Sequence, residues 1–132
     1  MTRAEFLDQY AEIVEKAQFA VDTSRREGLL ALEDTLDHAK ANTRDVFEYG
    51  LRFVIDGVPA KIIETVLSNI VAQEQDACVK TLKTIQKEAV LGIQAGINMR
   101  SLYALMNSYT DISLEEDPAV EKVFGGISGF VQ

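Results

Sequence analysis

The densest group of potentially reactive side chains is Glu33, Asp34, Asp37 and His38, in the stretch EDTLDH. On a helix, spacings of three and four residues would bring these carboxylates and the imidazole to one face, where a divalent ion can bind. A stable metal site also needs ligands from a second element. A solvated helix face explains the group better, and we expect no bound metal.

Other enzyme chemistry has little support. Cys78 is the only cysteine and His38, 40 positions upstream, the only histidine, which is weak support for a thiol–imidazole pair. The stretch FGGISG near the C-terminus follows a predicted helix and lacks the lysine of a phosphate-binding loop. We expect a non-enzymatic protein without a cofactor.

A second group of charges lies in SRREGLLALE, residues 24–33. Arg25 and Arg26 would end a helix, where cations complement the helix dipole by about 0.3–1 kcal/mol. Glu27 and Glu33 follow, and exposed carboxylates of this kind keep ordinary acidity. The residues alone favour a solvated surface, with a charged docking surface as the alternative.

Composition limits the function classes. The chain has 132 residues, 47% of them hydrophobic and 26% charged, which is typical of one globular domain. Its net charge of −8 disfavours nucleic acid and anionic membranes as partners. No apolar run approaches the roughly 20 residues of a membrane-spanning helix, and we recognise no signal peptide. With a single cysteine, we expect a soluble protein of the reducing cytoplasm.

The apolar spacing is helical throughout and predicts an all-α bundle. Expected helices cover residues 4–26, 29–40, 44–55 (capped by Asn42 or Thr43) and 99–109. Apolar helical positions place Tyr10, Tyr49, Tyr103 and Tyr109 in the core or at an interface edge. A capping box at residues 113–116, a short helix from 117 to 125 and a flexible tail at 125–132 complete a single domain, residues 1–124.

The stretch from Pro59 to Ala95 leaves two alternatives open. It forms one long central helix, or it breaks near residues 73–78 into a helical hairpin. A straight rod would expose apolar residues and favour a homodimer. On either side, Gly57 and Gly96 are expected to end helices, Asn98 to cap the next one, and Gly92 to allow close helix approach.

Three stretches together resemble the cytoplasmic parts of the flagellar stator A-subunit (MotA) family. They are SRREGLLALE, then EYGLRFVIDGVPAKIIETVLSNIVAQEQ, then KEAVLGIQAGINMRSLYALMNSY, in the order that the family has them. The resemblance covers roughly residues 15 to 112, and Met99 stands where the family usually has proline. The family's membrane helices are missing, and about a dozen polar residues, 76–87, replace the third and fourth.

The resemblance implies a docking role for part of SRREGLLALE. In the family, an arginine and a glutamate in this loop contact the charged helix of the rotor switch protein, and they match Arg25 and Glu33. Arg26 and Glu27 are neighbours that would contribute. The expected function is a protein-interaction module near the flagellar motor at the inner membrane, bound to the switch protein or to stator subunits. The alternative is a self-associating, homodimeric scaffold without motor contact.

Overall fold

The computed structural model describes residues 1–112, which form helices and no strands, so the expected all-α fold is confirmed. The helices are α1 (Arg3–Glu27), the 3-10 helix η1 (Leu29–Thr35), α2 (His38–Ala41), α3 (Val46–Ile55), α4 (Ala60–Ala72), α5 (Ala77–Ala95) and α6 (Met99–Asn107). The expected capping box at 113–116, helix at 117–125, flexible tail and domain boundary at 124 lie outside the described residues. Among residues 1–112, no helix combines the length and apolar character needed to cross a membrane.

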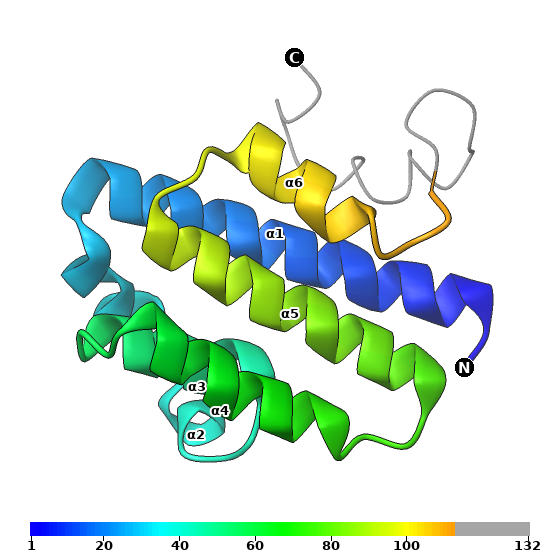
Figure 1. The fold of residues 1–132 in the computed structure, drawn as a ribbon. Coiled ribbons are helices and arrows are strands. Elements are labelled where there is room, and N and C mark those ends of the chain that lie inside the picture. Colours follow the sequence, from blue (N-terminus) through cyan, green and yellow to red (C-terminus); the bar gives the residue numbers. More distant parts are fainter. Residues whose placement is uncertain (113–132) are drawn as a thin grey trace.

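Helix α5 is the centre of the bundle. It packs against α1, α3, α4 and α6, and α1 runs beside it for most of its length (Figure 1). The reason is in its sequence, because apolar residues recur at helical spacing on the side of α5 that faces its neighbours. The buried ones are Leu82, Ile85, Ala89, Val90 and Ile93.

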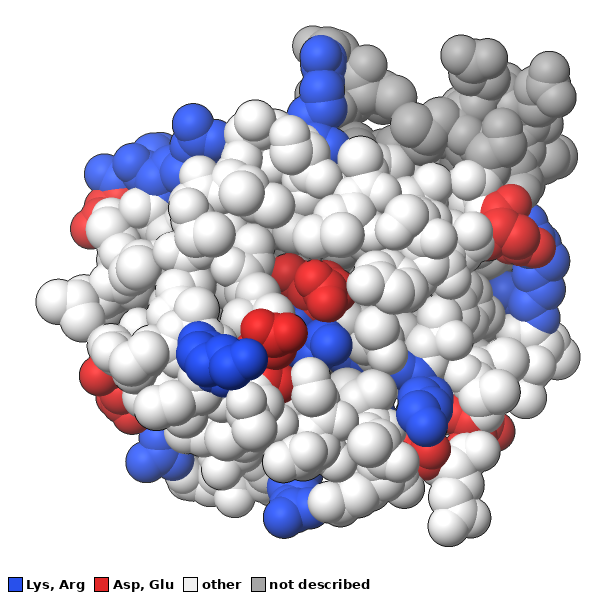
Figure 2. All heavy atoms as spheres, in the orientation of Figure 1, with Lys and Arg blue, Asp and Glu red and all other residues white. Residues whose placement is uncertain are grey.

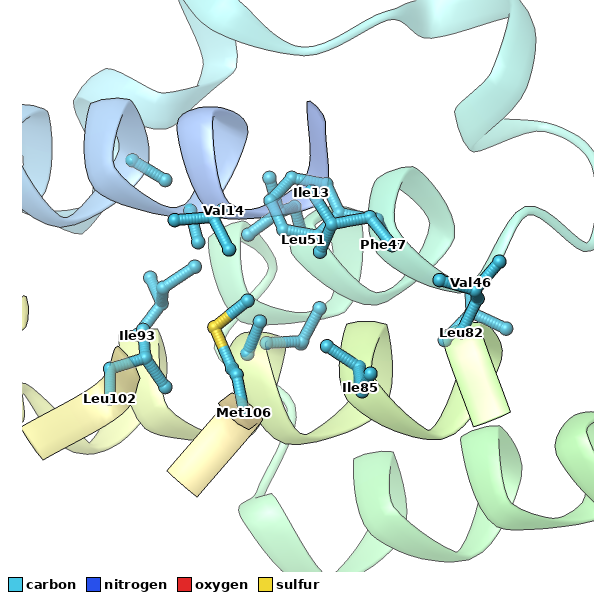
Figure 3. Close-up of a cluster of buried hydrophobic side chains, with 14 of the residues drawn as sticks. Ile13, Val14, Val46, Phe47, Leu51, Leu82, Ile85, Ile93, Leu102 and Met106 are labelled. Atoms are coloured by element: carbon cyan, nitrogen blue, oxygen red, sulfur yellow. The ribbon is translucent and has the colours of Figure 1, made fainter. Parts of the chain in front are cut away.

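The core is built from buried side chains of every helix of the described residues. Figure 3 shows Ile13 and Val14 of α1 and Phe47 and Leu51 of α3 pointing toward residues of α5 and α6. The largest fully buried side chains include Tyr10, Leu32, Ile63, Leu67, Ile85, Ile93, Leu102 and Met106. Of the four tyrosines expected in the core or at an interface edge, Tyr10 and Tyr103 are buried, Tyr49 is half-buried and Tyr109 is exposed.

The stretch from Pro59 to Ala95 is a helical hairpin, not one long helix. Helix α4 ends at Ala72, and Asp76 caps α5 by accepting a hydrogen bond from Val79 N at 3.0 Å. Glu74 in the turn pairs with Lys83 of α5 at 2.7 Å, and α4 lies against α5. The argument for a homodimer that depended on a straight rod therefore has no basis, and self-association stays a prediction.

The single helix expected over residues 29–40 is wrong. The chain forms η1, leaves it at Leu36 in an extended conformation, and starts α2 at His38. Asp37 explains the break, because its carboxylate accepts a hydrogen bond from Lys40 N at 3.2 Å and so caps a new helix. Helical spacing predicted Leu29, Leu32 and Leu36 on the buried side; Leu32 and Leu36 are buried and Leu29 is half-buried, while Leu30 is 73% exposed.

Helix ends follow the sequence signals elsewhere, with one correction. Asp45, not Asn42 or Thr43, caps α3 by accepting a hydrogen bond from Glu48 N at 2.9 Å. Gly57 and Gly96 have φ values of 75° and 74°, and each follows a helix as expected. Asn98 caps α6 by accepting a hydrogen bond from Ser101 N at 2.8 Å.

Candidate functional site

The charges predicted for docking lie around the junction of α1 and η1. Arg25, Arg26 and Glu27 occupy the exposed last turn of α1, which ends because Gly28 turns the chain with φ 91°. Arg25 and Arg26 line a surface depression of about 450 Å³ with Val21, Asp22 and Met99. Figure 2 shows basic side chains beside acidic ones at the edge of the molecule where α1 ends. This end of the bundle therefore presents cations to solvent.

Glu33 lies on η1 and faces another depression, of about 290 Å³, which His38, Arg52 and Asp56 also line. Its Oε1 lies 3.9 Å from His38 Nε2, and its side chain is about half exposed. Within residues 1–112, no ion pair joins Arg25 to Glu33. The structure thus places the two predicted contact residues in separate depressions.

The group Glu33, Asp34, Asp37 and His38 does not share one face, because residues 29–40 are not one α-helix. Asp37 caps α2, and Asp34 lines a third depression away from Glu33 and His38. No cluster of three or more potential metal ligands occurs in the part of the chain that the structure describes. Cys78 is exposed in the first turn of α5.

The third depression has the largest volume of the three, and no sequence pattern predicted it. It is a groove of about 500 Å³ between α1, η1 and α3. Its lining comprises Glu12, Glu15, Lys16, Phe19, Ala20, Asp34, Thr35, Phe47, Glu48 and Leu51. We call it the α1–α3 groove.

A buried carboxylate holds the walls of the α1–α3 groove together. The Glu48 side chain is 6% exposed, and its Oε1 lies 3.0 Å from Lys16 Nζ of α1. Its Oε2 accepts a hydrogen bond from Asp37 N at 3.1 Å. Lys16 Nζ also lies 4.9 Å from the centroid of the Phe47 ring, a cation–π distance. One glutamate of α3 therefore binds both α1 and the segment after η1.

Sequence reasoning did not single out Glu48 or Lys16, because charged residues at such helical positions are usually exposed. Glu48 follows the cap residue Asp45 by three positions, where an acid is usual in the first turn of a helix. The available signal was its spacing of three residues from Leu51, which places it at the edge of the buried face. Lys16 gives the same signal beside Ile13 and Ala17.

Comparison with known proteins identifies no relative: no protein-family model, curated protein or solved structure matches this chain. The stator resemblance accordingly depends on the three sequence stretches that carry it. The structure adds two surfaces suited to contact with another molecule, the charged end around Arg25 and the α1–α3 groove.

Proposed function

We propose that this chain is a non-enzymatic protein-interaction module that meets an oppositely charged partner surface through Arg25, Arg26, Glu27 and Glu33. The supporting observation is that all four side chains are exposed. Within residues 1–112, the side chains of Arg25 and Glu27 make no hydrogen bond or ion pair, and the Arg26 side chain makes only a local bond to Asp22 O at 3.3 Å. The Glu33 side chain has one neighbour of opposite character, the exposed His38, whose Nε2 lies 3.9 Å from Glu33 Oε1. A partner can therefore engage these charges without breaking interactions that stabilise the fold.

The stator resemblance suggests the partner class. It points to the charged helix of the flagellar rotor switch protein, or to stator subunits, and so to the cytoplasmic side of the inner membrane. Because Arg25 and Glu33 lie in separate depressions, such a partner would contact the two side chains at two separate places on its own surface.

The contact would be weak and salt-sensitive. Exposed ion pairs contribute about 0–1 kcal/mol each, and salt screens them over about 8–10 Å. Charge complementarity of this kind mainly raises association rates and sets specificity. Rapid exchange with a moving or transient partner is the behaviour expected from this surface.

Calorimetry of the full chain against the switch protein tests the proposal, with the variants Arg25→Glu and Glu33→Lys. Each reversal should weaken binding about threefold to fivefold. Lys61→Glu and Glu64→Lys are matched controls, since both residues are exposed on α4. If both reversals at Arg25 and Glu33 bind as tightly as the unaltered chain, this surface is not the docking site.

A self-associating scaffold is the second candidate. It is favoured by large apolar side chains left exposed, chiefly Leu30 at 73%, Phe19 at 57% and Ile62 at 52%. A homodimer would cover such residues. Light scattering at tens of micromolar distinguishes the candidates, because a monomer at that concentration excludes the scaffold.

A further inference from the structure

The α1–α3 groove has one wall built from a single stripe of α1. Glu12, Glu15, Lys16 and Phe19 follow one another at spacings of three, one and three residues, so they share a face of the helix. All four line the groove, and Asp34 of η1 lines it from the other wall. The groove is therefore a cleft between two elements with acidic residues on both sides.

The groove also offers apolar surface. Phe19 is 57% exposed, an unusual exposure for a phenylalanine in a helix of a bundle, and Phe47 and Leu51 line the same groove. A volume of about 500 Å³ falls in the range of pockets that accept bulky ligand groups. An apolar side chain of a partner can thus be buried against Phe19.

The charge left in the groove is negative. Lys16 is the one cation among the lining residues, and Glu48 pairs with it at 3.0 Å. That leaves Glu12, Glu15 and Asp34, which are exposed and make no ion pair within residues 1–112. Three uncompensated carboxylates around an apolar floor complement a cationic, amphipathic occupant.

This protein itself does not supply such an occupant, either as a second copy or through its own residues 113–132. The whole chain carries a net charge of −8, so a second copy would bring further negative charge to an acidic groove. The chain's own residues 113–132 contain four acids, Glu115, Glu116, Asp117 and Glu121, against one base, Lys122. The complementary charge has to come from a different molecule.

We infer that the α1–α3 groove binds a basic amphipathic segment of a partner protein, with an apolar side chain against Phe19 and lysines or arginines facing Glu12, Glu15 and Asp34. This is the helix-in-groove mode of recognition, in which apolar anchors supply affinity and flanking charges supply orientation. The surface is separate from the charged end around Arg25. It goes beyond the proposed function, since it adds a second binding site with its own partner chemistry.

Fluorescence anisotropy of the full chain tests the inference with a labelled synthetic helix of leucine and lysine at amphipathic spacing. We expect saturable binding that the same peptide with glutamate for lysine does not show. Phe19→Ala should raise the Kd about tenfold, and Glu15→Lys about threefold to fivefold. Arg25→Glu should leave binding unchanged, which separates this inference from the proposed function.

Matched controls use α4, where Ile62 is 52% exposed and Glu64 is exposed. Ile62→Ala and Glu64→Lys repeat the two changes away from the groove and should leave the Kd unchanged. Equal losses in the groove and control variants would overturn the inference, because attraction to the net charge would then account for binding. Equal binding of the leucine–glutamate peptide, or a dimer that Phe19→Ala dissolves, would overturn it as well.

Discussion

Lys16 and Glu48 form an ion pair of 3.0 Å that joins the middle of α1 to the first turn of α3. The same Glu48 carboxylate accepts a hydrogen bond from Asp37 N at 3.1 Å, so three segments of the chain meet at one side chain. Glu48 is 6% exposed and Lys16 34% exposed, which leaves the glutamate in a mostly dry environment and the lysine partly in water. Removing the carboxylate leaves Asp37 N without its acceptor and Lys16 with only the Phe47 ring as a partner.

Glu48→Ala should therefore destabilise the fold by about 2 kcal/mol, less than for a fully buried pair because water reaches Lys16. Glu48→Gln keeps an acceptor for Asp37 N and should cost about half as much. Urea denaturation measures both, and Glu64→Gln on the exposed face of α4 serves as the control. If Glu48→Ala is as stable as the unaltered chain, the Lys16–Glu48 pair does not stabilise the fold.

Gly50→Ala should destabilise more than Gly92→Ala, although both glycines lie inside helices. A Cβ at Gly50 would lie 2.9 Å from both methyl carbons of Val90, a buried β-branched side chain that cannot rotate away. A Cβ at Gly92 would meet the ends of Leu102 and Ile97, at 2.7 and 3.0 Å, which can move. We expect losses of about 2 and 1 kcal/mol by thermal unfolding, and the reverse order would contradict this account.

Alkaline unfolding should begin when the tyrosines of the α1–α6 contact ionise. Burial raises the pKa of Tyr103 to about 12 and raises the pKa of Tyr10 as well. In the unfolded chain these tyrosines ionise near pH 10, whereas in the folded chain they stay neutral at that pH. Their contribution to the free energy of unfolding is therefore fully present below pH 10 and is lost as the pH rises from 10 to 12.

Tyr10→Phe should reduce this loss between pH 10 and 12, measured as the midpoint of thermal unfolding. At pH 7 the same variant should lose about 1 kcal/mol, since Tyr10 donates a hydrogen bond of 3.3 Å to Asn107 Oδ1. Tyr49→Phe, at a half-buried site, is the control. If the midpoint of thermal unfolding of Tyr10→Phe falls between pH 10 and 12 as steeply as that of the unaltered chain, ionisation of Tyr10 does not cause the loss.

Low pH should weaken two surface ion pairs, Lys83–Glu74 and Arg3–Asp111. The hydrogen bond from Lys83 holds the pKa of Glu74 below 4.5, and the hydrogen bond from Arg3 holds the pKa of Asp111 below 3.8. Their contribution is present above those values and is lost as the pH falls through the lower folded-state pKa values. Glu74→Gln should show a shallower decline of the urea midpoint below pH 4.5, and an identical decline would rule out a role for the pair.

Local signals predicted most of the helices. Gly96 correctly marked the end of α5 and Asn98 the start of α6, because capping depends on residues a few positions apart. The hairpin at residues 73–76 was one of two alternatives, since a polar stretch with good helix formers does not show whether the chain turns. The break at Asp37 was missed because a capping aspartate and a solvated helical aspartate look alike in sequence.

The α1–α3 groove could not be predicted from sequence. Its walls come from residues 12–20, 34–35 and 47–51, and only the packing of three helices brings them together. Arg25 and Glu33 show the same limit. They were paired through the stator resemblance, and the turn at Gly28 followed by η1 places them in separate depressions.

Helix α1 packs against η1, which directly follows it, and against α5 and α6, which come much later in the chain. During synthesis on the ribosome, Tyr10, Val14 and Ala17 emerge long before residues 77–107 exist to cover them. The hairpin of α4 and α5 can assemble from neighbouring sequence, whereas this face of α1 stays uncovered until α5 and α6 have been synthesised. Helix α1 thus leaves the exit tunnel well before the helices that complete its packing, and nascent chains cut short before α5 should be the ones that chaperones retain.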